Sequence, residues 1–176
     1  MIFSAIWCRV MGKSSFNVLK TPAWAISTLG GLGHFSAMPG TVGSIVACFF
    51  ALLIPSFLLY MLIPVVIVLG VWASGKYESE KGSEDPSEVI IDEVAGVWIA
   101  MAGHVVSQET MVYALPALFL FRIFDILKPV PVSTAEKLPG GIGIVADDVV
   151  AGILANILLW GLRWLFVMGG YANLFS

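Results

Sequence analysis

Carboxylates that interrupt apolar sequence are the residues of this chain most able to do chemistry. All twelve Asp and Glu residues lie between Glu78 and Asp148. Several fall within its most apolar stretches, namely Asp92, Glu93, Asp125, Asp147 and Asp148. A carboxylate near a bilayer is costly, so it usually pairs with a base, binds a metal or lines a functional cavity. The pattern therefore predicts a site at a membrane that holds cations.

The first acidic stretch, VIIDEVAG over residues 89–96, places two carboxylates near the start of an expected helix. Asp92 and Gly96 are four residues apart and share a helical face, where the glycine leaves room for a close neighbour or a ligand. Glu93 lies about 100° further round the helix, so both acids can contribute to one wall of a site. The alternative is a capping cluster, because the helix dipole favours acids in a first turn.

The second stretch, FRIFDILKPVP over residues 121–131, mixes one acid with two bases. Arg122, Asp125 and Lys128 follow one another at intervals of three and fit one helical stripe. Asp125 can pair with either base, or bind a metal while the bases bind an anion. Arginine is the better bidentate phosphate ligand, and lysine acts as a point charge. The alternative is a buried structural ion pair at the end of a membrane helix.

The third stretch, GGIGIVADDVVAG over residues 140–152, runs from a glycine-rich turn into a helix that opens with Asp147 and Asp148. Adjacent acids repel each other, and a divalent cation would screen them. Mg²⁺ prefers carboxylate oxygens and retained waters, often shared with a substrate phosphate. The alternative is a pair of solvated acids that cap the helix, with the glycines serving the geometry of the turn.

A fourth segment, MPGTVGS over residues 38–44, contains a turn signal followed by hydroxyl side chains. Thr41 suits a helix N-cap, and free backbone N–H groups there would suit an anion. A plain helix start explains the segment about as well. His34 and His104 stand alone, so we interpret both as structural, with His34, just upstream of this turn, the one that merits a test.

The elements that carry these residues are expected to be helices in a membrane. Of the 176 residues, 59% are hydrophobic and only 12% are charged, against about 25% charged residues in soluble domains. The length fits one domain over residues 1–176, with a basic N-terminal tail over 1–21 and a helical membrane core over 22–168. The net charge of −3 gives no support to nucleic-acid binding. Cys8 and Cys48 are isolated and predict neither a metal site nor a disulfide framework.

The hydropathy pattern predicts an all-α protein with about four or five membrane helices. Helices are expected over 89–106, 111–127 and 144–168, with either one span plus a partial helix or two short, kinked spans over 45–73. The polar residues 74–88 would form the long hydrophilic loop, and 129–143 a turn-rich connection. Lys and Arg residues favour the cytoplasmic side, which places the N-terminus and every acidic cluster near that face.

Together the four segments closely resemble the phosphatidylglycerophosphatase A family. The motifs PGTVGS, EDPSEVIIDEVAG, FRIFDILKPVP and GGIGIVADDVVAG occur in this order between Pro39 and Gly152. The resemblance implies a helical, multi-pass enzyme of the bacterial inner membrane with its site towards the cytoplasm. The implied reaction is the Mg²⁺-dependent hydrolysis of phosphatidylglycerophosphate to phosphatidylglycerol and inorganic phosphate. Val130 departs from the family pattern, in which an aromatic residue often stands between the two prolines.

The resemblance also carries roles over to individual positions. Asp92, Glu93, Asp147 and Asp148 would hold one or two Mg²⁺ ions. Arg122 and Lys128 would bind phosphate oxygens, with Thr41 and Ser44 also contacting the substrate. The catalytic set would be Asp92, Asp125, Arg122 and Lys128, with Asp125 either orienting Arg122 or completing the metal site. The nucleophile, water or an aspartate, stays open.

Two other classes of protein compete with this interpretation. A cation- or proton-coupled transporter would also carry intramembrane acids, but the chain is small, shows no internal repeat and places bases beside its acids. A non-catalytic scaffold would have no use for so many placed carboxylates. The sequence leaves the oligomeric state open.

Overall fold

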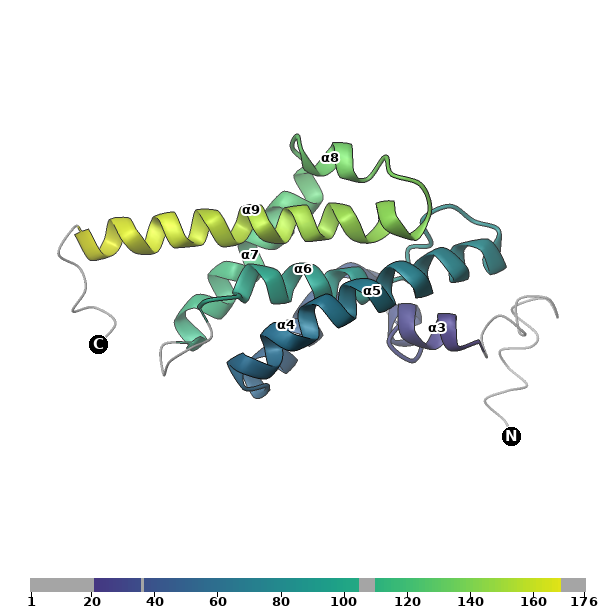
Figure 1. The fold of residues 1–176 in the computed structure, drawn as a ribbon, viewed down its shortest axis with the longest axis horizontal. Helices are drawn as coiled ribbons and strands as arrows, with labels where there is room; N and C mark the ends of the chain where they lie inside the picture. Colours follow the sequence, from purple (N-terminus) through teal and green to yellow (C-terminus); the bar gives the residue numbers. More distant parts are fainter. Residues whose placement is uncertain (1–20, 36, 105–109, 169–176) are drawn as a thin grey trace.

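The computed structural model describes residues 21–35, 37–104 and 110–168, and this part of the chain is helical without any strand (Figure 1). The elements in chain order are α3 (Pro22–Ser27), the short 3-10 helix η1 (Leu32–His34), α4 (Pro39–Leu53), α5 (Ser56–Lys81), α6 (Ile91–Met101), α7 (Thr110–Leu127), α8 (Val132–Ala135) and α9 (Gly141–Met168). The all-α prediction is confirmed for the described residues. The basic residues before Thr21 lie outside them.

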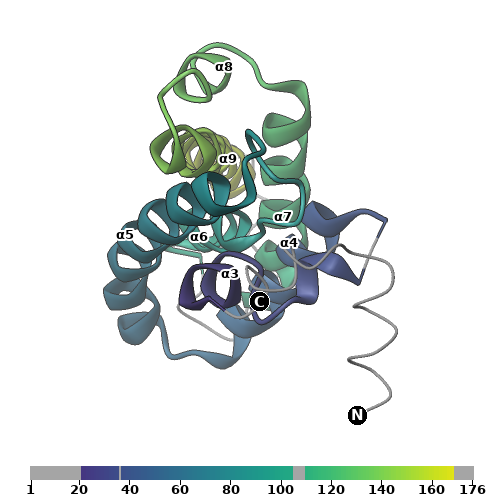
Figure 2. The same cartoon turned by 90° about the vertical axis from the view of Figure 1, so that its right-hand side faces the viewer.

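Helix α6 lies at the centre of the fold, with α4, α5, α7 and α9 packed around it (Figure 2). It has 11 residues, nine of them buried. At about 1.5 Å per residue it is roughly half as long as the ~30 Å hydrocarbon core of a bilayer. The prediction of one membrane helix over 89–106 is therefore wrong in length, because the helix ends at Met101. In the structure, this apolar segment is a helix buried in the core of the protein.

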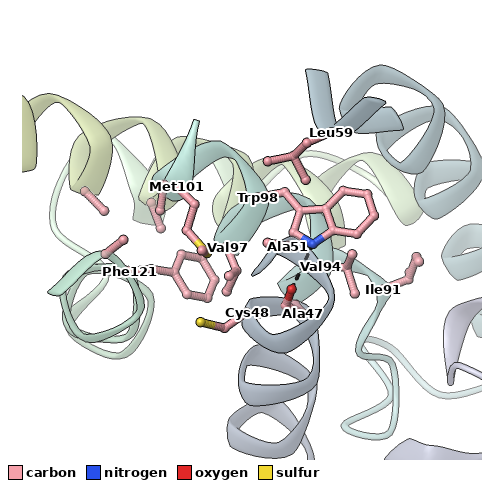
Figure 3. Packing of buried hydrophobic residues seen from close by; sticks show 14 of the residues in the cluster. Ala47, Cys48, Ala51, Leu59, Ile91, Val94, Val97, Trp98, Met101 and Phe121 are labelled. Atoms are coloured by element: carbon pink, nitrogen blue, oxygen red, sulfur yellow. Dashed lines mark hydrogen bonds between the residues drawn. The ribbon is translucent and has the colours of Figure 1, made fainter. Parts of the chain in front are cut away.

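Small residues let the neighbours of α6 approach closely. A side chain at Gly96 would collide with the Phe121 ring and the backbone oxygen of Asp148, and one at Gly152 would collide with the backbone of Gly96. The α6 and α9 backbones are therefore almost in contact where they cross. On the opposite side of α6 the indole of Trp98 donates a hydrogen bond of 3.0 Å to the carbonyl of Ala47 on α4 (Figure 3). These contacts fix the middle of α6 against α4, α7 and α9.

The boundaries of several helices differ from those that the hydropathy pattern predicts. The apolar run over 45–73 is divided at Pro55 between α4 and α5, which supports two helices, while Pro64 lies inside α5. Helix α5 continues to Lys81 and ends on Gly82 in a left-handed conformation. The hydrophilic loop over 74–88 is thus wrong in its first half, where Tyr77 is buried against the core. The connection over 129–143 contains the short helix α8.

Among the described residues, two helices are long and apolar enough to cross a membrane by length and composition: Ser56–Lys81 and Gly141–Leu165. Only 17% of the most apolar window of α5 is buried inside the molecule, although a core helix of a soluble protein would be mostly covered. Its exposed side chains include Phe57, Leu58 and Val68. A membrane protein is therefore plausible, and the count of four or five membrane helices stays a prediction.

Candidate active site

Four helices bring the acids and bases of the sequence motifs into one region. Asp92 and Glu93 lie in the first turn of α6, and Asp147 and Asp148 lie in the second turn of α9. Arg122 and Asp125 belong to the last turns of α7, and the first turn of α4 contributes backbone and hydroxyl groups. The crossing of α6 and α9 at Gly96 sets the distance between the two acidic pairs, because α6 is held against α9 at the level of Asp148.

Arg122 is the centre of one half of the site. Its Nη1 lies 2.9 Å from both carboxylate oxygens of Glu93, 2.7 Å from Asp125 Oδ2 and 3.5 Å from Ser44 Oγ. The Ser44 hydroxyl lies 2.5 Å from Glu93 Oε2 and 2.8 Å from the carbonyl oxygen of Gly40. The Arg122–Asp125 pair follows from the spacing of three residues, and the links to Glu93 and Ser44 join three helices that the sequence leaves separate.

The N-terminus of α4 reaches this cluster because residue 40 is a glycine. A side chain there would collide with the Glu93 carboxylate and the Arg122 guanidinium. The prediction that Thr41 caps the helix is wrong, since α4 begins at Pro39 and its cap residue is Met38. Thr41 lies in the first turn instead, where it shares a groove with Ser44 and Arg122. Backbone N–H groups of a first helical turn have no partner within the helix, so this end of α4 can receive an anion.

Lys128 belongs to the other half of the site. It follows the last residue of α7 in a left-handed conformation with φ of 43°, which takes it off the stripe that the sequence spacing predicted with Arg122 and Asp125. Its Nζ lies 2.9 Å from Asp147 Oδ2 and 2.6 Å from Glu136 Oε1. Although burial opposes it, these hydrogen bonds and charges raise the pKa of Lys128 above its usual range. Glu136 is a partner that the motif analysis missed.

Asp92 and Asp148 differ from the other predicted acids of the site, Glu93, Asp125 and Asp147, because no Lys or Arg pairs with them among the described residues. The backbone N–H of Glu93 donates to Asp92 Oδ1 at 2.9 Å, and Asp148 is only 4% exposed. Both interact unfavourably with each other and with Glu93 and Asp147. Burying a carboxylate without a partner is costly, so these two side chains mark the part of the site that most needs a cation.

The pKa of Glu93 reflects the same crowding of carboxylates. Its helix, α6, has 11 residues and is too short to span a membrane. Burial raises the pKa of the Glu93 carboxyl to about 7, although the Arg122 guanidinium and the Ser44 hydroxyl act in the opposite direction. The negative charge of the nearby Asp125 contributes to this net rise of the Glu93 pKa. A carboxyl with such a pKa exchanges a proton near neutral pH, and perturbed groups of this kind cluster at functional sites.

The predicted metal ligands form a suitable donor set without forming a closed site. Oxygen ligands from carboxylates are those that Mg²⁺ prefers, and Asp92, Glu93, Asp147 and Asp148 lie close enough to repel one another. Within the part of the chain that the structure describes, however, no three acidic, His or Cys side chains converge in a way that would hold a metal ion. The residues fit the group chemically, and holding it would require their side chains to rotate towards one another.

A further acid, Glu88, was missed by the motif analysis and supports the start of α6. It accepts a hydrogen bond of 2.6 Å from the Tyr77 hydroxyl and pairs with Lys81. A side chain at Gly33 would collide with its backbone carbonyl, so η1 packs directly on this residue. The signal in the sequence is the spacing of four between Tyr77 and Lys81, which is visible only if α5 is extended past residue 73. Glu88 holds the segment that leads into Asp92 and Glu93.

The two histidines have structural surroundings. His34 Nε2 accepts a hydrogen bond of 2.9 Å from the Trp24 indole, and the two rings stack. His104 is buried between the rings of Tyr113 and Trp160.

Two cavities adjoin the site. One, of about 450 Å³, is lined by polar and acidic residues that include Glu78, Glu136, Lys137 and Asp147. The other, of about 360 Å³, has Arg122 and Ser44 at one end and is otherwise mostly apolar. The acidic cavity therefore adjoins the Asp147 side of the site, and the apolar cavity adjoins the Arg122 side.

A helical fold with two helices of membrane length, and carboxylates beside an arginine and a lysine, is typical of an enzyme that handles phosphate. The chain belongs to the phosphatidylglycerophosphatase A family, whose model matches residues 25–163. The resemblance found in the motifs is thereby confirmed, and the chain is a hydrolase of the phosphatidylglycerophosphatase type.

Curated relatives cover most of the chain. A Bacteroides thetaiotaomicron protein named "Putative phosphatidylinositol-3-phosphatase" is 37% identical over 83% of this chain and 98% of its own length. Phosphatidylglycerophosphatase A of Haemophilus influenzae is 31% identical over 83% of this chain and 91% of its own, and that of Escherichia coli is 32% identical over 80% and 85%. No solved structure was found to match the chain.

Proposed function

We propose that this protein hydrolyses phosphatidylglycerophosphate to phosphatidylglycerol and inorganic phosphate, with Mg²⁺ held by the acids of α6 and α9. The observation that carries the proposal is the position of Arg122, which lies between buried carboxylates and the first turn of α4. This arrangement offers positive charge and backbone donors for a phosphate on one side and oxygen ligands for a cation on the other.

The phosphate would lie between Arg122 and the start of α4. Among the described residues, the side-chain hydrogen bonds of the Arg122 guanidinium are made by Nη1. The Nη2 edge would then face an incoming phosphate oxygen. Thr41 and the N–H groups of the first turn would donate to other oxygens. Asp125 would keep the guanidinium in place, since its Oδ2 lies 2.7 Å from Nη1.

The cation would be held by Asp92, Glu93, Asp147 and Asp148. When bound, Mg²⁺ would neutralise the phosphate and lower the pKa of a coordinated water. Lys128, anchored by Glu136 and Asp147, would bind a phosphate oxygen at the edge of the acidic pair. Fixed charges of this kind usually provide the largest part of catalysis. Whether water or an aspartate attacks the phosphorus is left open by the geometry.

The proposed location is the inner membrane of a bacterium, with the site near the cytoplasmic ends of the helices. The relatives named as phosphatidylglycerophosphatases come from bacteria, and the substrate class is a membrane lipid. The acids lie in first and second helical turns, which suits a headgroup that stays at the surface while its acyl chains remain in the bilayer.

A second substrate, phosphatidylinositol 3-phosphate, is suggested by the name of the Bacteroides relative. Both lipids present a phosphomonoester on a hydroxylated headgroup. Binding of either headgroup can be tested at the cavity of about 450 Å³. This cavity is lined by Glu136 and Asp147, the two partners of Lys128. The rival transporter hypothesis has no support from these relatives.

The test is the release of inorganic phosphate by purified protein in detergent, from each lipid, with Mg²⁺ or with a chelator. We expect release from phosphatidylglycerophosphate in Mg²⁺ only, and its loss in Asp92→Asn and Asp147→Asn. Glu80→Gln removes one negative charge from α5 outside the acidic cluster and should keep full activity. Undiminished turnover in both Asp variants would remove these acids from the site, and release from neither lipid would overturn the proposed function.

A further inference from the structure

The cavity of about 360 Å³ beside Arg122 is a groove between two helical faces. On α7 its lining residues are Leu115, Leu118, Phe119 and Arg122, at helical spacings of three and four that place them on one face. On α4 they are Thr41, Ser44 and Ile45, with the same spacing. The polar members of both faces lie at one end, since Arg122 Nη1 is 3.5 Å from Ser44 Oγ. The surface of the groove itself is almost wholly apolar, and its Arg122 end adjoins the polar cluster.

The end of the groove away from Arg122 is lined by exposed apolar side chains. Leu115 is 70% exposed, Phe119 66% and Ile45 54%. Leu115 is seven residues before Arg122, so the groove extends about 10 Å along the helix from the guanidinium. Contiguous exposed apolar surface of this kind typically marks a ligand groove, a partner interface or a membrane contact. A hydrocarbon chain fits such an apolar surface, and an anionic headgroup attached to it would lie next to the Arg122 end.

The exposed apolar surface of α5 differs from this groove. Helix α5 also exposes large apolar side chains, among them Phe57, Met61 and Val68, but none of them lines the cavity that reaches Arg122. The α4–α7 groove is hollowed and continuous with the Glu93–Arg122–Ser44 cluster. This continuity distinguishes a chain bound together with its phosphate from bulk lipid around the protein.

We propose that the α4–α7 groove binds one acyl chain of the lipid whose phosphate lies at Arg122. The inference rests on the proposed function, because it takes Arg122 as the phosphate ligand. Leu115, Phe119 and Ile45 then contribute to substrate affinity. This affinity depends on the length of the acyl chain that lies in the groove. Each methylene removed from water contributes roughly fourfold to affinity, so a few methylenes in the groove give a large preference.

The experiment compares kcat/KM for phosphatidylglycerophosphates with dibutyryl, dihexanoyl and dioctanoyl chains, below the concentrations at which they form micelles. For the unchanged protein we expect kcat/KM to rise at least tenfold across the series. In Leu115→Trp, which fills the open end of the groove, we expect this ratio to fall at least fivefold. Leu165→Trp is the matched control, because Leu165 is 59% exposed on α9 outside the groove, and it should keep the original ratio.

Phe119→Ala is the second variant, in case the tryptophan disturbs folding. It removes one wall of the groove without adding volume and should also flatten the dependence on chain length. Phosphate release that is equal for all chain lengths, or equal losses in Leu115→Trp and Leu165→Trp, would overturn the groove while leaving the phosphatase function intact. A change of oligomeric state in Leu115→Trp with an unaltered ratio would assign the face to a second copy and would also overturn it. No release from any lipid would instead refute the proposed function.

Discussion

The acids of the site divide into two groups that the fold treats differently. Glu93, Asp125 and Asp147 each lie within 3 Å of an Arg or Lys nitrogen. Asp92 and Asp148 pair with no Arg or Lys in the described part of the chain, although Asp148 is almost fully buried. Paired acids are explained by structure alone. A buried Asp148 and a half-buried Asp92 without a base are a cost to folding, and the fold keeps them where α6 meets α9, which points to a function.

The largest expected effect separates the two groups directly. In Asp148→Asn we expect phosphate release to fall by roughly a thousandfold, because the stabilisation that a cation gives to a phosphoryl transition state amounts to several kcal/mol. The melting temperature should stay the same or rise, since a buried charge without a base is removed. Asp147→Asn should also lose activity, but its melting temperature should fall because Lys128 loses a partner.

Thermal unfolding in detergent and a phosphate assay on the same preparations provide the measurement. If Asp148→Asn destabilises the protein as much as Asp147→Asn, the distinction between paired and unpaired acids is not valid.

Arg122→Lys tests the paired group at its centre. We expect a loss of about a hundredfold in kcat/KM, because a lysine keeps the charge but lacks a second nitrogen to contact the phosphate while the first contacts Glu93, Asp125 and Ser44. Lysine and arginine are not equivalent at such a site. Kinetics with phosphatidylglycerophosphate would show the loss, and an unchanged kcat/KM would remove Arg122 from the phosphate site.

The crossing that holds the unpaired acids can be tested through its glycines. Gly96→Ala should lower the stability by about 2–3 kcal/mol, because overpacking of a tight contact has this typical cost and the new methyl group would meet Phe121 and the Asp148 backbone. Gly161→Ala on α9 is the control, since nothing lies within 4 Å of its added carbon. Equal melting temperatures for the two variants would show that the close approach of α6 and α9 is incorrect.

The smallest expected effect concerns Glu88, a paired acid outside the catalytic cluster. Although burial opposes it, hydrogen bonds from Lys81 and Tyr77 lower the pKa of Glu88. A carboxyl with a lowered pKa stabilises the fold above its ordinary pKa of about 4.3 and loses this contribution as the pH falls through the folded value. Glu88→Gln should therefore cost about 1–2 kcal/mol at pH 7 and little at pH 3.

Melting temperatures of Glu88→Gln and of Glu84→Gln, an exposed control, across this pH range would check the prediction. A difference between Glu88→Gln and the unchanged protein that does not shrink in acid would show that the pair with Lys81 and Tyr77 is not what Glu88 contributes.

The sequence allowed the chemistry of the site to be predicted better than its geometry. The acids and bases stand out because charge is rare in this chain, and the spacing of Arg122 and Asp125 already implies a local pair. The partners of Lys128 could not be found in this way, because they depend on a left-handed residue after α7 and on the return of the chain through α8.

The fold shows the same limit. Hydropathy reveals that α6 is apolar, but it does not distinguish a helix covered by protein from one covered by lipid. The burial of α6 follows from contacts such as those of Gly96 and Trp98 with residues more than 20 positions away. Thr41 was misplaced for a local reason, since Pro39 starts α4 two residues earlier and Met38 takes the cap position.

The central claim is that the unpaired acids of α6 and α9 hold a divalent cation that the phosphatase needs. Calorimetric titration of the purified protein with Mg²⁺, without substrate, tests it most directly when Asp148→Asn and Glu80→Gln are measured alongside. We predict saturable binding to the unchanged protein and to Glu80→Gln, and none to Asp148→Asn. Equal Mg²⁺ binding by Asp148→Asn, or full phosphate release by the unchanged protein in a chelator, would contradict the account.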